Sequence, residues 1–368
     1  MPSFELLPAL PLDLNPVWRS YRGGSVLRAF RGQPGTGDDH FPEDWLASTV
    51  LARNGEHSQG VMEGLSRISD ANSNLLIESL KQRPGFWFGP GQRAHQDSLT
   101  LGVLWKLLDS AVRLQFQAHP DARFARRHLN SPAGKTECWY ILGTRGEAYV
   151  YLGFQHSPSR EAWARMIREQ RVEEMLACFE KIRVQPGDCY VVPAGTPHAI
   201  GAGIFMMELM EPTDWVVRCE TTNAGVTLPP EACFMGLDLE TCMEVFDYRA
   251  YSVAKVRRTF QQSPRELVCT NDYCEEELIG PTYHEYFRLH RLRGHGDASW
   301  PGGELMLLIV ITGEANLLCG GQGQPVRAGQ TLLLLPGAAQ SWNWTQPSGD
   351  WEILLAKLPV FQSSSHHS

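Results

Sequence analysis

The segment at residues 186–201, PGDCYVVPAGTPHAIG, constrains the fold more strongly than any other part of the sequence. Its spacing is G-x5-P-x-G-x2-H, and it is met by Gly187, Pro193, Gly195 and His198. The first glycine permits a tight turn, and the proline ends the short apolar strand that follows. The second glycine lets the next loop point the histidine inward. We therefore expect a β-rich fold in which this loop delivers one metal ligand.

A second copy of this pattern, AGQTLLLLPGAAQSWNW, begins at Ala328. It repeats the glycine turn, the apolar strand, the proline and the small residues, but it has Gln340 or Ser341 where the first copy has His198. Other strand-like segments are short and are separated by Pro-Gly turns, and one clearly helical segment interrupts them at residues 159–182. The pattern predicts a mainly β fold of two jelly-roll β-sandwiches with a small helical segment, in which only the first sandwich holds a metal.

The sequence divides into five parts by pattern. We expect an N-terminal segment at 1–112 whose strands pack on the first sandwich, a metal-binding catalytic sandwich at 113–222, a helical linker at 223–275, a C-terminal sandwich without a metal site at 276–361 and a disordered tail at 362–368.

Two local patterns add detail to these parts. The Gly-Gly pair before residues 25–30, SVLRAF, predicts a tight turn into a short strand. Residues 134–142 and 147–154 alternate around TRGE, which predicts a β-hairpin.

The composition is that of an ordinary globular protein, because 43% of the 368 residues are hydrophobic and 20% are charged. The formal net charge of −8 does not indicate a nucleic-acid or anionic-membrane partner. We find neither an apolar run near the roughly 20 residues of a spanning helix nor a signal-peptide pattern, so we expect a cytoplasmic protein. Its nine cysteines lack paired spacing, and we expect reduced thiols.

Four side chains form a candidate metal site. Gln117 and His119 are two residues apart on a predicted strand, so both leave the same face. Glu137 lies on the next strand, and if the two strands are neighbours in one barrel, these residues meet His198 in its interior. A lone buried histidine is more often a hydrogen-bonded core residue, but two histidines within these motifs favour a metal. Two imidazoles, a carboxylate and an amide oxygen suit zinc before other ions.

Four motifs in order carry a resemblance to a known family. QAHPD, GKTECWYIL, PGDCYVVPAGTPHAIG and ELMEPTDWVVR together resemble class I mannose-6-phosphate isomerases in their short bacterial form. That family consists of zinc enzymes of the cupin superfamily that interconvert mannose 6-phosphate and fructose 6-phosphate. The resemblance implies two cupin domains, one Zn²⁺ per chain held by Gln117, His119, Glu137 and His198, and isomerisation through a cis-enediol.

The same resemblance implies roles for three further residues. Lys135 shares the strand face of Glu137 and is a candidate acid–base or oxygen-polarising group. Asp214 and Arg218 lie in TDWVVR, which is similar to the SDNVVR of the family. Asp214 is then a base or a base-orienting group, and Arg218 stabilises the enediolate. Their structural alternative is an ion pair that ties adjacent strands.

The sequence departs from the family at the residues that select the substrate. Lys106 matches the phosphate lysine of the family, but Gln115 replaces a serine that helps to hold phosphate, and Trp215 replaces the asparagine beside Asp214. We expect Lys106, Gln115 and Trp139 to contact the substrate, and we expect that substrate to be mannose 6-phosphate. A different or unphosphorylated aldose, such as mannose, remains the alternative.

Three other functions compete with an isomerase: a sugar-sensing cupin that binds metal without turnover, an iron-dependent dioxygenase, and a storage-type protein without metal. Lys135, Asp214 and Arg218 argue against the first, and a Gln–His–Glu–His set suits redox-silent zinc better than iron. We expect a small sugar as the partner, without nucleic acid or membrane, and a monomer or homodimer.

Overall fold

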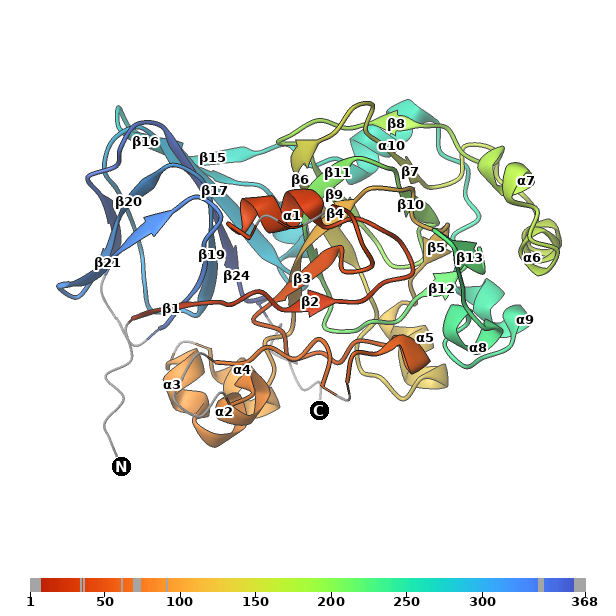
Figure 1. Ribbon diagram of the computed structural model, residues 1–368, viewed down its shortest axis with the longest axis horizontal. Helices are drawn as coiled ribbons and strands as arrows, with labels where there is room; N and C mark the ends of the chain where they lie inside the picture. Colours follow the sequence, from red (N-terminus) through yellow and green to blue (C-terminus); the bar gives the residue numbers. More distant parts are fainter. Residues whose placement is uncertain are drawn as a thin grey trace, which may run out of the picture.

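The computed structural model describes residues 8–360, except 34, 36, 61, 69–73, 91 and 337–340. It is mainly β, which confirms the predicted fold class, and its sheets lie in two halves that sit side by side (Figure 1). Gln340 and the predicted tail at 362–368 lie outside the described residues, and Ser341 is exposed.

Two antiparallel sheets form the first sandwich. One has six strands in the order β2 (Pro16–Val17), β3 (Glu43–Leu46), β4 (Leu104–Ser110), β11 (Ile204–Met210), β6 (Glu137–Thr144) and β9 (Cys189–Val192). The other has five strands in the order β12 (Val217–Arg218), β5 (Gln117–Ala118), β10 (His198–Ile200), β7 (Tyr149–Leu152) and β8 (Ile182–Arg183). Apolar side chains of both sheets, among them Leu108, Trp139 and Ile200, form one buried cluster between them.

The second sandwich combines a seven-stranded and a four-stranded sheet around a core that includes Trp300, Leu308 and Trp344. The larger sheet has the order β1 (Ala9–Pro11), β22 (Thr331–Leu334), β19 (Met306–Thr312), β24 (Trp351–Lys357), β17 (Arg288–Gly294), β16 (Tyr273–Glu277) and β15 (Arg265–Cys269). The smaller has the order β18 (Ala298–Trp300), β23 (Trp342–Thr345), β20 (Glu314–Cys319) and β21 (Gln322–Arg327). Because β1 pairs with β22, the N-terminal segment contributes to both halves. The predicted domain boundaries remain a prediction.

The two sandwiches share a hydrophobic core between their large sheets. Trp105, Cys138 and Met207 point out of the six-stranded sheet and belong to the same buried cluster as Leu307 and Leu354 of the seven-stranded sheet. The central strands of the six-stranded sheet are therefore buried on both faces. Alternate residues, including Lys106, Glu137 and Glu208, are left facing the interior of the first sandwich.

Short helices surround the sheets. They are α1 (Ser25–Phe30), α2 (Leu76–Gln82), α3 (Pro84–Phe88), α4 (Arg93–Ser98), α5 (Ala122–His128), α6 (Arg160–Arg168), α7 (Val172–Leu176), α8 (Pro230–Cys233), α9 (Leu239–Cys242) and α10 (Val253–Phe260). Of these, α1 to α3 contribute to the core between the two sandwiches. In Figure 1, α6 to α9 lie at the end of the molecule farthest from the second sandwich. Trp163 and Ile167 of α6 pack with Ala118, Ala199 and Val217 on the outer face of the five-stranded sheet.

Several local predictions are wrong in detail. Residues 25–30 form α1 and not a strand. The predicted hairpin is absent from the described residues, because β6 pairs with β11 and β9 in one sheet whereas β7 pairs with β10 and β8 in the other. The long helix predicted at 159–182 is divided into α6 and α7, and Gln170 between them has φ 52°.

The cysteine prediction is wrong for one pair, since Cys269 of β15 and Cys274 of β16 form a disulfide. The other seven cysteines are free and buried. Among the residues that the structure describes, no helix has both the length and the apolar character needed to cross a membrane.

Candidate functional site

One wall of the site is a row of paired residues in the five-stranded sheet. Gln117 of β5 lies opposite His198 of β10 on one side and opposite Arg218 of β12 on the other. Ala118 and Ala199 pack outward beneath the helices. Strand alternation therefore turns Gln117 and His198 toward the interior.

The facing wall is a row in the six-stranded sheet, where Glu208 of β11 lies opposite Lys106 of β4 and Trp139 of β6. Glu137 is two residues before Trp139 and shares its face. The strands of Gln117 and Glu137 are not neighbours, which was the condition under which these residues were expected to meet, because β5 and β6 belong to different sheets. The two residues approach each other across the sandwich.

His119, Glu137 and His198 are all buried, and one candidate ligand atom from each lies within 4.8 Å of the others. Nε2 of His119 is 2.9 Å from Oε1 of Glu137, and Nε2 of His198 is 3.7 Å from Oε2 of the same carboxylate. Gln117 joins them, with its Nε2 at 3.1 Å from Nε2 of His198. The structure thus brings the four predicted ligands together.

Backbone carbonyls orient both imidazoles. Nδ1 of His119 is 2.8 Å from the oxygen of Trp215, and Nδ1 of His198 is 2.8 Å from the oxygen of Thr196. A carbonyl accepts only, so each Nδ1 donates, and each Nε2 is left with a lone pair for a ligand. Burial lowers the pKa of His119 to about 4 and also lowers the pKa of His198, which favours the neutral form that a metal requires.

This arrangement fits a cation. The Nε2 lone pair of His119 and Oε1 of Glu137 are both acceptors, and at 2.9 Å they repel each other unless a cation or a proton lies between them. Oε1 of Glu137 is buried and accepts no hydrogen bond, and its nearest cation is Nζ of Lys135 at 3.1 Å. The amide of Gln117 can turn to present its oxygen to the same position. The cluster is therefore able to hold a metal ion.

The loop between β9 and β10 behaves as its motif predicts. Gly195 has φ 87°, and a Cβ there would lie 2.9 Å from the carbonyl oxygen of Val245. The N–H of Gly195 donates to the carbonyl of His119 at 2.7 Å. This glycine therefore joins the two chain segments that carry the histidines.

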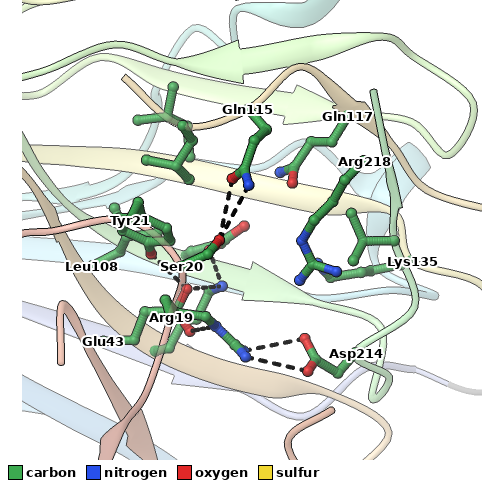
Figure 2. A pocket seen from close by; sticks show the side chains of 15 residues that line it. Arg19, Ser20, Tyr21, Glu43, Leu108, Gln115, Gln117, Lys135, Asp214 and Arg218 are labelled. Atoms are coloured by element: carbon green, nitrogen blue, oxygen red, sulfur yellow. Dashed lines mark hydrogen bonds and ion pairs between the residues drawn. The ribbon is translucent and has the colours of Figure 1, made fainter. Parts of the chain in front are cut away.

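A small chamber opens beside the candidate metal site (Figure 2). Six of the predicted residues line it: Lys106, Gln115, Gln117, Lys135, Asp214 and Arg218. Trp139 does not line the chamber. It is fully buried, and its indole N–H donates to Oε2 of Glu137 at 3.1 Å, so its contact is with a candidate ligand.

Arg19, Glu43 and Glu208 also line this chamber, and sequence reasoning missed them. Arg19 lies 3.0 Å from Glu43 and 3.2 Å from Asp214 (Figure 2). Lys106 lies 2.6 Å from Glu208 and 3.2 Å from Glu43. Glu208 had a signal in the sequence, because it is the one charged residue in the apolar strand IFMMELM. No sequence pattern around Arg19 marks it as a residue of the site.

Charge pairing sets the protonation of these groups. Burial opposes ionisation of Glu43, but Arg19 and Lys106 outweigh it and hold the pKa of that carboxyl well below its usual range. Burial and then the charge of Glu137 raise the pKa of Glu208 to about 8. Burial likewise opposes ionisation of Asp214, yet Arg19 and then Lys135 lower its pKa.

The chain is similar in sequence to known isomerases. The chain is 37% identical to the mannose-6-phosphate isomerase of Streptococcus mutans over 253 residues, which cover 68% of this chain and 72% of that protein. It is 30% identical to the mannose-6-phosphate isomerase ManA of Bacillus subtilis over 239 residues, 65% of this chain and 70% of that protein. No family model matches the chain.

Solved structures share the fold. The mannose 6-phosphate isomerase of Bacillus subtilis superposes with a TM-score of 0.71 at 21% identity, over 94% of this chain and 99% of that one. A variant of the phosphomannose isomerase of Salmonella typhimurium gives 0.67 at 14% identity, over 96% and 100%. Sequence identity and coverage together place the chain: it belongs to the mannose-6-phosphate isomerase family, a family of isomerase enzymes.

Proposed function

We propose that the protein is a zinc-dependent aldose–ketose isomerase that interconverts mannose 6-phosphate and fructose 6-phosphate through a cis-enediol. The observation that carries this proposal is a His–Glu–His cluster beside a chamber with a lysine, a carboxylate and an arginine. The names of the relatives from Streptococcus mutans and Bacillus subtilis support the same reaction. The cytoplasm remains our prediction for its location.

We propose that Gln117, His119, Glu137 and His198 hold one Zn²⁺ per chain. Two imidazoles, one carboxylate and an amide oxygen form a ligand set that suits zinc better than magnesium or calcium, which prefer oxygen ligands alone. When bound, the ion supplies a Lewis acid that polarises a substrate oxygen.

The chain itself must move two protons and stabilise one negative charge. A base takes the proton from C2 and returns it to C1, a second proton passes from the oxygen on C2 to the oxygen on C1, and negative charge develops on oxygen between these steps. Lys135 is 3.1 Å from Glu137 and lines the chamber, so it is the group that we assign to proton transfer. The guanidinium of Arg218 also lines the chamber, and we assign it to the developing oxyanion.

Asp214 fits an orienting role better than that of a base. Its Oδ2 accepts from the backbone N–H of Arg53 at 2.8 Å, and its Oδ1 accepts from Arg19 at 3.2 Å. Both oxygens are therefore occupied, and the carboxylate fixes the side chain of Arg19 at the base of the chamber.

The charge of the chamber supports an anionic substrate. Four cationic and four acidic side chains meet there, namely Arg19, Lys106, Lys135 and Arg218 with Glu43, Glu137, Glu208 and Asp214. A divalent ion therefore leaves about two positive charges when all four acids are ionised, and more when Glu208 is protonated. A phosphate monoester carries about 1.5 to 2 negative charges at pH 7 and balances this excess.

One observation favours the alternative of an unphosphorylated aldose. Both residues that the family resemblance assigns to phosphate are already engaged, since Lys106 lies between Glu43 and Glu208 and Gln115 hydrogen-bonds with Ser20. If no other cationic side chain binds a phosphate, a neutral sugar such as mannose would suit this chamber.

Proton NMR in heavy water separates these candidates. The enzyme is incubated with mannose 6-phosphate, mannose and other aldoses, and deuterium at C1 or C2 identifies both the substrate and the enediol route. We expect exchange and conversion with mannose 6-phosphate. Absence of both with every aldose contradicts an isomerase, and iron in the purified protein together with oxygen consumption indicates a dioxygenase.

A further inference from the structure

We propose that Arg53, stacked on Trp215 at the rim of the chamber, binds the phosphate group of the substrate and determines specificity for a phosphorylated sugar. This inference rests on the proposed isomerisation of mannose 6-phosphate. It assigns the phosphate to a residue outside the chamber and not to Lys106.

The position of Arg53 is fixed by two contacts. Its guanidinium carbon lies 3.6 Å from the centre of the Trp215 ring. Its backbone N–H donates to Oδ2 of Asp214 at 2.8 Å. Asp214 lines both the inner chamber and a larger groove of about 860 Å³, and Arg53 and Trp215 line that groove. The stacked pair thus lines the groove next to Asp214, the residue that the groove shares with the chamber.

Trp215 also links this rim to the metal cluster, because its backbone oxygen accepts from Nδ1 of His119 at 2.8 Å. A substrate whose C1 and C2 lie at the metal has its C6 phosphate at the other end of the sugar. That end must lie away from the ligands, and the groove beside Trp215 offers the space for it.

The charges inside the chamber leave Arg53 as an available phosphate partner. Arg19, Lys106 and Lys135 lie 3.0, 2.6 and 3.1 Å from carboxylate oxygens, so each is already neutralised. Arg53 and Arg218 form no ion pair with any residue that the structure describes. Arg218 faces the chamber (Figure 2), where we assign it to the reacting oxygen. Arg53 then remains for the phosphate.

Stacking on an indole ring prepares a guanidinium to bind a phosphate group. Contact with the indole holds one face of the planar group, while its N–H donors point outward in the plane. Those donors match two phosphate oxygens in a bidentate pair. Arg53 is exposed, so this contact needs no rearrangement of the core.

The test compares Arg53→Gln, Arg53→Lys and Trp215→Leu with a matched control, Arg83→Gln. Arg83 is also exposed and lies over an aromatic ring, that of Phe86 at 4.4 Å, but it does not line the chamber or the groove. Loss of a charge-assisted hydrogen bond predicts a KM for mannose 6-phosphate about 10- to 100-fold higher in Arg53→Gln, with kcat within about twofold. Arg53→Lys should retain part of the affinity, and Arg83→Gln should match the wild type.

Inorganic phosphate supplies a second measurement. Its inhibition constant should rise in Arg53→Gln and in Trp215→Leu in parallel with KM, because a misplaced or absent guanidinium weakens the same contact. A purely structural role of Arg53 would lower kcat or the unfolding midpoint without this parallel change.

Two results overturn the inference in distinguishable ways. If the wild type converts mannose 6-phosphate and Arg53→Gln has the KM and phosphate inhibition of the wild type, Arg53 does not bind phosphate, while the proposed function stands. If the wild type does not convert mannose 6-phosphate, the proposed function fails and this inference fails with it.

Discussion

Glu208 lies directly opposite Lys106 on neighbouring antiparallel strands, and its Oε2 is 2.6 Å from Nζ of that lysine. Both side chains are buried, and Lys106 also contacts Glu43 at 3.2 Å. The lysine thus pairs with two acidic side chains at the base of the chamber. Its first role is to make this concentration of buried acids stable.

Substitution of Lys106 by methionine should therefore destabilise the fold. Removing one partner of a buried ion pair costs about 3–5 kcal/mol, because the remaining charge is left without compensation. Urea unfolding measures this loss. The double variant Lys106→Met/Glu208→Gln should recover part of it, and Arg183→Met, which breaks a surface pair with Glu147, should cost less than about 1 kcal/mol. Equal losses in the buried and surface variants would contradict the account.

Glu43 should make stability depend on acid pH. Arg19 and Lys106 overcome the effect of burial and depress its folded pKa, so its contribution is complete above the unfolded value of about 4.3 and is lost as the pH falls through the folded value. Glu43→Gln should lower the unfolding free energy by about 3–5 kcal/mol at pH 7. Urea unfolding at pH 7, 5 and 3.5 should show this difference shrinking below pH 4. A difference that stays constant with pH would contradict this assignment.

Gly134 should be essential for the position of Lys135. A Cβ at Gly134 would lie 2.6 Å from the oxygen of Pro120 and 2.7 Å from the nitrogen of Ala122, and both are backbone atoms. The backbone N–H of Lys135 donates to that same oxygen at 3.0 Å. Gly134→Ala must push the two segments apart.

A displacement of about 1 Å is able to reduce turnover about 100-fold, and we expect a loss of this order in Gly134→Ala. Gly85→Ala is the matched control, since a Cβ at this position in α3 meets nothing within 4 Å. Steady-state turnover of mannose 6-phosphate measures both variants. Wild-type activity in Gly134→Ala would show that the segment adapts without moving Lys135.

Arg218→Ala should lower kcat for mannose 6-phosphate about 100- to 1000-fold, as expected for the loss of a group that stabilises an oxyanion. The guanidinium also donates to the backbone oxygen of Ala232 at 2.9 Å, so its removal could lower stability as well as activity. The kinetic loss is assigned to catalysis only if the unfolding midpoint of the variant is unchanged. A variant within a few-fold of the wild type would remove Arg218 from the mechanism.

The grouping of the four candidate ligands was predictable because motifs encode local geometry. Gly195, three residues before His198, has a positive φ and a close backbone contact that both disfavour a side chain. The spacing of the motif places a glycine at this position. The mainly β fold was predictable for the same reason. The assignment of strands to the two sheets was not predictable. The sequences of β6 and β7 have the pattern of a hairpin, although each strand pairs with other strands.

The charge network was beyond sequence reasoning, because its partners are far apart in the chain. Arg19 meets Asp214 across 195 positions, and no local pattern predicts that contact. Residues 25–30 show a related limit. They follow a Gly-Gly pair that predicts a turn into a strand, yet they form α1, and Asp109 accepts hydrogen bonds from the backbone N–H groups of Gly24 and Val26. Tertiary contacts decided both outcomes.

The central claim is that a metal held by Gln117, His119, Glu137 and His198 is required for isomerisation. The most direct measurement is the metal content and the mannose 6-phosphate conversion of one preparation, before chelation, after chelation and after the return of Zn²⁺. We predict about one zinc per chain, loss of conversion with the metal and recovery when zinc is restored. Full conversion by the metal-free protein would contradict the account.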